Sequence, residues 1–137
     1  MVIAATKVVQ DRLKTTKIEE SKGASLVFCW DTHLTKIKGR NVLFIVNASN
    51  RYTIAMTDIE PRNWNYYTMY IRSVIHGVMQ EMGYSEDQIG QYFKMSGDTT
   101  VTKTHGRKSV GGINRMVMDA QYFGKKLEKE AKYQWVL

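Results

Sequence analysis

Hydrophobic residues in the first half of the chain follow the patterns of β-strands. Residues 2–5 form a short apolar run, and residues 26–30 form a second one. Residues 42–46 are apolar without alternation, as expected for a strand buried on both faces of a sheet. Residues 52–57 alternate between large and small side chains, which is typical of a strand with one buried face. These runs predict that the sheet comes from this half.

Turn and cap residues mark where these segments end. Thr6 stands where an N-cap residue would open a short helix over residues 7–13, and the polar residues 15–25 predict a loop. A further strand run ends at a turn over residues 38–40. Residues 47–50 have the composition of a hairpin loop. The pattern therefore predicts short strands joined by tight connections.

Helical spacing of apolar residues dominates the second half. It is clearest over residues 63–82, preceded by Pro61, which suits the first turn of a helix, and followed by Gly83, a helix stop. Residues 85–88, Ser-Glu-Asp-Gln, have the form of a capping box that opens another helix. We expect the helix to end at Gly97.

The remaining segments complete the predicted fold. Residues 99–103 are a short strand candidate, and a last helix is expected to open at Ser109 or Gly111. Because strands cluster early and helices late, we expect one α+β domain over residues 1–137. Its antiparallel or mixed sheet would have about four to five strands, mostly from the N-terminal half, packed by helices mostly from the C-terminal half.

Composition narrows the class of protein. A chain of 137 residues is long enough for one core without metals or disulfides. The single cysteine, Cys29, lies in an apolar run and is predicted to be a small buried hydrophobe. No segment has the length of a membrane span or the core of a signal peptide, so we expect a cytoplasmic protein. A net charge of +7 favours nucleic acid, an anionic surface or an acidic protein as partner.

The strongest concentration of positive charge lies between residues 94 and 115. This span holds five basic residues and one acidic residue, a local excess of four positive charges. It joins a strand candidate to a helix candidate, and helix N-termini favour anions. We therefore predict an anion or nucleic-acid site there, without a cofactor. Its residues would be Lys103, Thr104, His105, Arg107, Lys108, Gly111, Gly112, Asn114 and Arg115.

Three other groups of residues have possible functional roles. His105, with Lys103 and Arg107, has the residue types of metal-independent RNA cleavage, in which an imidazole moves a proton and cations stabilise the phosphorane. Asp31 and His33 would face the same side of a strand, but no third ligand has recognisable spacing, so no metal site is predicted. Four aromatic residues follow Arg62 and could pack in the core or stack on bases. They are Trp64, Tyr66, Tyr67 and Tyr70.

Several blocks of the sequence resemble a small bacterial domain family of unknown function. The family has the segments W-H-A-N-L-x-x-I, R-R-K-x-x-x-F-V-N and K-T-x-N-R-S-x-x-G-x-M-N, in that order. The resemblance covers residues 1–123 approximately. The matching positions are Trp30, Leu34, Ile37, Asn47, Lys103, Thr104, Arg107, Gly111 and Asn114. The chain departs from the pattern at Asp31, His33, Gly106 and Lys108. The resemblance implies a single domain and implies that the segment from Lys103 to Asn114 is important.

Three functions are compatible with these patterns. The first is a basic, non-enzymatic domain that binds nucleic acid, or a complex containing it, through the cationic turn. The second is a protein-binding inhibitor of a host defence complex, because small proteins of this kind are associated with phages and mobile elements. The third is a small endoribonuclease that uses His105. The sequence lacks the signatures of serine hydrolases, glycosidases and nucleotide-binding loops. We therefore expect a binding domain rather than an enzyme.

Overall fold

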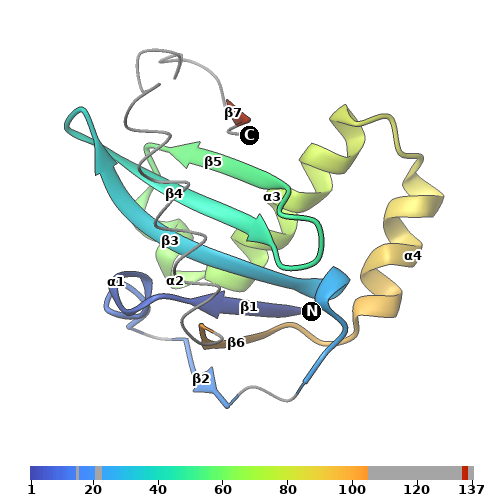
Figure 1. Cartoon of the computed structure of the whole chain (residues 1–137), viewed down its shortest axis with the longest axis horizontal. Helices are drawn as coiled ribbons and strands as arrows, with labels where there is room; N and C mark the ends of the chain where they lie inside the picture. The colour runs from blue at the N-terminus through green and yellow to red at the C-terminus, as the bar shows by residue number, and fades with distance from the viewer. Residues whose placement is uncertain (15, 21–22, 105–133, 136–137) are drawn as a thin grey trace.

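The chain folds around a mixed β-sheet with helices packed against it (Figure 1). A computed structural model describes residues 1–14, 16–20, 23–104 and 134–135. Within these residues the sheet has seven strands in the order β2-β6-β1-β3-β4-β5-β7. The strands are β1 (Val2–Ala5), β2 (Ile18–Glu19), β3 (Cys29–Ile37), β4 (Arg40–Asn47), β5 (Thr53–Thr57), β6 (Thr100–Lys103) and β7 (Gln134–Trp135). The expected α+β class and mixed sheet are confirmed, and the two edge strands have only two residues each.

The sheet combines a parallel half with an antiparallel half. β1 lies between β3 and β6 and is parallel to both, whereas β3, β4 and β5 form an antiparallel meander. A two-residue loop joins β3 to β4, and both of its residues, Lys38 and Gly39, have positive φ angles of 50° and 81°. This is the backbone of a type I′ turn, whose twist matches that of the flanking strands. The predicted turn at residues 38–40 is therefore a tight hairpin.

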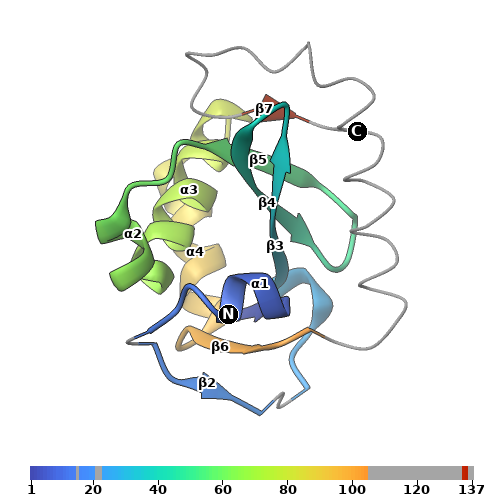
Figure 2. The same ribbon diagram turned by 90° about the vertical axis from the view of Figure 1, so that its left-hand side faces the viewer.

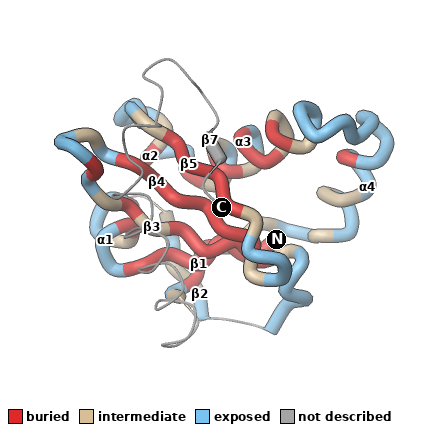
Figure 3. The backbone as a smooth tube through the Cα atoms, turned by 45° about the horizontal axis from the view of Figure 1, so that its top comes forward, coloured by how far each residue is buried: buried red, intermediate tan, exposed pale blue. Residues whose placement is uncertain are grey.

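The helices of the second half cover one face of the sheet. They are α2 (Pro61–Asn65), α3 (Tyr67–Glu81) and α4 (Glu86–Ser96), and they lie on the same side of the strands (Figure 2). The apolar stripe of α3, which includes Ile71, Val74 and Ile75, packs against sheet residues in one buried cluster. Figure 3 shows the buried residues concentrated in the central strands, while α4 is largely exposed. The core therefore lies between α3 and the sheet.

Local geometry changes three of the predicted elements. The apolar residues 26–28 form a short 3-10 turn, η1 (Leu26–Phe28), instead of the start of a strand. The two expected strand runs up to residue 37 are one continuous strand, β3, of nine residues. The helix expected over residues 63–82 is interrupted at Tyr66, whose φ and ψ angles of −118° and 49° are not helical. This break separates α2 from α3, and across it Trp64 stacks on Tyr67, with 5.6 Å between ring centroids.

The two predicted N-caps have different outcomes. Thr6 occupies the N-cap position of α1 (Lys7–Gln10), but its side chain does not cap the helix, which is also shorter than predicted. Its hydroxyl lies 2.9 Å from Nδ1 of His33 instead. Ser85 forms the complete capping box with Gln88, so the start of α4 is confirmed. In the part of the chain that the structure describes, no helix is both long enough and apolar enough to cross a membrane.

Candidate functional site

The predicted anion site lies mostly outside the residues that the structure describes. His105, Arg107, Lys108, Gly111, Gly112, Asn114 and Arg115 belong to this group, and so does the helix expected to open at Ser109 or Gly111. Lys103 and Thr104 are described. Lys103 is the last residue of β6 and is exposed, and Thr104, which follows it, is half-buried. The predicted strand at residues 99–103 is thereby confirmed as β6.

Sheet pairing places a second basic segment near Lys103. Lys103 is paired with Ala5, the last residue of β1, and the chain then enters α1 at Lys7. Residues 7–17 hold four basic residues and one acidic residue. The four are exposed: Lys7, Arg12, Lys14 and Lys17. Because β1 and β6 are parallel, their carboxyl ends lie together, so α1 begins beside Lys103. Lys17, which precedes β2, lies level with Thr100 at the other end of β6.

Some of these cations have partners on the surface. The ammonium group of Lys7 lies 2.9 Å from the Asp11 carboxylate, one helical turn away. The guanidinium of Arg12 lies over the Trp64 ring, 5.8 Å from its centroid. Asp11 offsets the charge of Lys7, whereas Arg12 keeps its full positive charge over the ring, so residues 7–17 carry a net excess of three positive charges. We name the set Lys7, Arg12, Lys14, Lys17 and Lys103 the basic edge.

Asp31 and His33 do not converge with Lys103. Paired residues of neighbouring strands point to the same face, so Asp31 shares its face with Ala4 and Thr102. Lys103, one residue on from Thr102, points to the other face. His33 lies on the Asp31 side, as the spacing predicts. The described parts of the two groups are therefore separated by the sheet, and no shared cleft supports catalysis.

The surroundings of His33 and Asp31 favour a structural role. His33 is half-buried, and burial holds the pKa of its imidazole below the ordinary value. Asp31 is fully buried. Burial, and next the charge of Asp31, raise the pKa of the Cys29 thiol, which confirms a buried cysteine that is not poised as a nucleophile. Among the described residues, no group of three or more His, Cys, Asp or Glu side chains could hold a metal ion.

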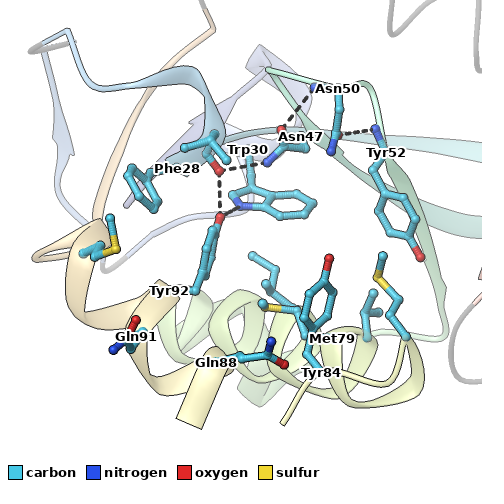
Figure 4. A pocket seen from close by; sticks show the side chains of 15 residues that line it. Phe28, Trp30, Asn47, Asn50, Tyr52, Met79, Tyr84, Gln88, Gln91 and Tyr92 are labelled. Atoms are coloured by element: carbon cyan, nitrogen blue, oxygen red, sulfur yellow. Dashed lines mark hydrogen bonds between the residues drawn. The ribbon is translucent and has the colours of Figure 1, made fainter. Parts of the chain in front are cut away.

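A large cleft opens between the sheet and the helices α3 and α4 (Figure 4). Its volume is about 520 Å³, within the range of ligand-binding clefts. Trp30 and Tyr52 line it from the sheet side, and Met79 and Tyr84 face them from the helix side. Tyr92 of α4 lies at one end of the cleft, beside Trp30. We name this feature the aromatic cleft.

Hydrogen bonds connect the walls of the aromatic cleft. The indole Nε1 of Trp30 donates to the hydroxyl of Tyr92 at 3.0 Å, and that hydroxyl donates to the Val27 carbonyl at 2.8 Å. The same carbonyl accepts from the Asn47 amide at 3.0 Å. Burial raises the pKa of the Tyr92 hydroxyl, so it stays protonated and can donate. These bonds join α4 to the start of β3.

Several polar groups of the cleft are already used by the protein. The Asn47 carbonyl oxygen accepts from the backbone of Ser49 and Asn50. The Asn50 side chain accepts from the Tyr52 backbone, and the Gln88 side chain accepts from the N-cap backbone of α4. The cleft therefore offers mainly apolar and aromatic surface to an occupant.

The sequence patterns did not single out this cleft. Its walls come from η1, β3, the β4–β5 loop, α3, the α3–α4 turn and α4, so no local motif marks it. The aromatic residues that the sequence did single out have other roles. Tyr67, which is buried in the core as predicted, and Trp64 stack on each other, whereas Tyr66 is exposed. One available signal was Met79, a large apolar residue next to the predicted α3 stripe.

The comparisons with known proteins give a family without an assigned activity. No curated protein and no solved structure matches the chain. A family described as a domain of unknown function (DUF6933) matches residues 2–137. This match agrees with the resemblance to a small domain family of unknown function noted in the sequence. The chain therefore belongs to this family of domains of unknown function.

Proposed function

We propose that this protein is a non-enzymatic domain that binds nucleic acid through the phosphate backbone at the basic edge. The observation that carries the proposal is the pairing of Lys103 with Ala5, which brings Lys103 beside the start of α1 and its basic residues. Phosphate contacts depend on several exposed Lys and Arg side chains in one region. The net charge of +7 adds a long-range attraction for a polyanion.

The basic edge supports backbone contacts better than base recognition. Its described cations stand on a four-residue helix, a connecting segment and a strand end, none of which is an extended recognition helix. Backbone contacts give affinity with little sequence preference. As proposed from the sequence, further phosphate contacts would come from Arg107, Lys108 and Arg115, which follow Lys103 in the chain. The Gly111-Gly112 pair would let a phosphate approach the backbone closely.

Salt titration tests the proposal directly. Fluorescence anisotropy with a labelled 20-nucleotide RNA and a 20-base-pair DNA duplex, between 50 and 200 mM KCl, measures how affinity depends on salt. We expect the slope of log affinity against log salt to be steep for the unmodified protein. For the duplex, the magnitude of this slope should be smaller by roughly two in the Lys17→Gln/Lys103→Gln variant.

A charge-matched control separates the site from net charge. The Arg51→Gln/Lys94→Gln variant also removes two positive charges, but from the β4–β5 loop and the end of α4. We expect it to keep the slope of the unmodified protein. Absence of binding at 50 mM KCl, affinity that does not change with salt, or equal effects of the two variants would each refute the basic edge.

A further inference from the structure

We infer that the aromatic cleft is a docking site for a partner polypeptide that inserts large apolar side chains and carries lysine or arginine next to them. The inference is independent of nucleic-acid binding, since it concerns other residues. Figure 1 shows α4, which forms one wall, and α1, which carries part of the basic edge, at opposite ends of the molecule. The argument rests on exposure, polarity and charge.

The cleft is open enough for a chain segment. Four of its lining residues are strongly exposed although they are large and apolar: Val27 (41%), Met82 (48%), Tyr84 (45%) and Met95 (71%). A small ligand is usually buried over most of its surface, which an open cleft with such walls does not provide. A polypeptide segment can lie along the cleft and cover these side chains together. Methionine and tyrosine are also enriched in protein–protein interfaces.

The polar groups of the cleft argue against a nucleobase as occupant. A base read by a protein needs donors and acceptors directed at its edge, as well as a stacking surface. In the cleft, the Trp30 indole, the Tyr92 hydroxyl and the Asn47 amide are committed to one another or to the backbone. Met79, Met82 and Met95 add flexible apolar surface that adapts to side chains of different shape. Apolar side chains therefore suit the cleft better than bases.

Charge at one end of the cleft adds a preference for cations. Residues 73–93 hold three acidic residues and no lysine or arginine, in a chain with a net charge of +7. These acids are Glu81 at the end of α3 and Glu86 and Asp87 at the start of α4. Burial, and next the negative charge of Glu81, raise the pKa of Tyr52 to about 12, which places Glu81 within electrostatic reach of the cleft.

Two cations also lie near the cleft, and one of them, Lys94, lines the same surface pocket as Glu86 and Asp87. Arg51 lies between the lining residues Asn50 and Tyr52, and Lys94 precedes the lining residue Met95. The acidic residues are therefore grouped around the α3–α4 turn, with Lys94 at the margin of the group. A basic residue of the partner would lie over this turn while its apolar neighbours enter the cleft. A phosphate backbone would meet repulsion at the same place.

Selection from a random 12-residue peptide library tests this inference without a known partner. The immobilised full-length protein serves as bait, and peptides that bind the Met95→Gln variant equally well are discarded. We expect the enriched peptides to carry at least two large apolar residues and a neighbouring lysine or arginine. Affinity of one enriched peptide, measured by fluorescence anisotropy, should fall about tenfold in Met95→Gln.

Matched variants show whether the cleft is responsible. Met69→Gln removes a methionine of similar exposure, 66%, from another surface of α3 and should leave peptide affinity unchanged. Glu81→Gln/Asp87→Asn should weaken the basic peptide severalfold at low salt, whereas Glu19→Gln/Glu20→Gln, with the same charge change, should not. Circular dichroism verifies that each variant is folded, and affinities are compared among folded variants.

Several results would overturn the inference. One is a library that yields no peptide dependent on Met95, and another is enrichment of acidic peptides. Binding of a 12-nucleotide RNA that Met95→Gln abolishes would identify nucleic acid as the occupant. Concentration-dependent dimerisation that the same substitution abolishes would identify a second copy of the chain. The Lys17→Gln/Lys103→Gln variant should bind the peptide normally, so failure of the proposed nucleic-acid function is distinguishable.

Discussion

Removal of the Tyr92 hydroxyl should destabilise the protein through one hydrogen-bonded link. This hydroxyl accepts a hydrogen bond from Trp30 and donates one to Val27, joining α4 to the beginning of β3. The ring has its own contacts, with centroid distances of 5.3 Å to Phe28 and 5.6 Å to Phe93. Tyr92→Phe keeps this ring and deletes only the hydroxyl, so its effect measures the link.

The size of the effect follows from which partners remain. A net hydrogen bond contributes about 0.5–1.5 kcal/mol, so two bonds set an upper value of about 3 kcal/mol. The Val27 carbonyl keeps the Asn47 amide as a donor, so its loss is partial. Trp30 Nε1 loses the acceptor shown for it at 3.0 Å. We therefore expect the free energy of unfolding to fall by about 1–2 kcal/mol.

Urea denaturation followed by far-UV circular dichroism measures this change. The midpoint should shift while the slope of unfolding free energy against urea stays constant, because the exposed surface is unchanged. Tyr84→Phe is the control, since Tyr84 lines the same cleft but is 45% exposed, and we expect a change within about 0.5 kcal/mol. Equal effects of the two substitutions would refute the link between α4 and β3.

Three further predictions concern single residues. Lys38→Asn should stabilise the β3–β4 hairpin by about 0.5 kcal/mol in urea denaturation, because asparagine tolerates a positive φ better than lysine; a destabilised variant would contradict the type I′ turn. The pKa of His33 is lowered by burial, so the unfolded state binds its proton more readily and stability should fall as pH drops below the ordinary histidine value near 6.5. His33→Gln should reduce that loss between pH 7 and 5, and an unchanged pH profile would exclude the contribution of this imidazole. Cys29 should react slowly with iodoacetamide at pH 7.5 and rapidly in 8 M urea, since its thiol is buried and its pKa is raised; rapid reaction of the folded protein would show an accessible thiol.

Elements with strong local signals could be predicted from the sequence. The capping box at Ser85, the turn at Lys38-Gly39 and the helical stripe of α3 depend on residues a few positions apart, and each is present. The break at Tyr66 was not predicted, because helical spacing continues through it and only tertiary packing distinguishes α2 from α3. β3 seemed divided because polar residues interrupt its apolar pattern, whereas residues such as Thr32 are buried there.

Features that depend on long-range pairing could not be read from local patterns. The neighbours of β1 are β3 and β6, which begin at residues 29 and 100, and no short-range signal specifies such parallel pairing. The basic edge exists only because of this pairing, so residues 7–17 seemed unrelated to Lys103 in the sequence. The aromatic cleft likewise required the packing of α4 near β3. The sequence shows how many charged and aromatic residues the chain has, but not which of them lie together in the basic edge and the aromatic cleft.

The separation of the two proposed sites has a consequence for how partners would bind. α1 and α4 lie at opposite ends of the long axis, and charges farther apart than a Debye length of about 8 Å are largely screened at physiological salt (Figure 1). Phosphates at the basic edge would then leave the acidic α3–α4 turn and the cleft accessible. Nucleic acid could then occupy the basic edge while a polypeptide occupies the cleft. The binding free energy of each partner would not depend on the other. A protein carrying Lys103→Gln and Met95→Gln should therefore show each single defect unchanged, because the two substitutions remove contacts to different partners.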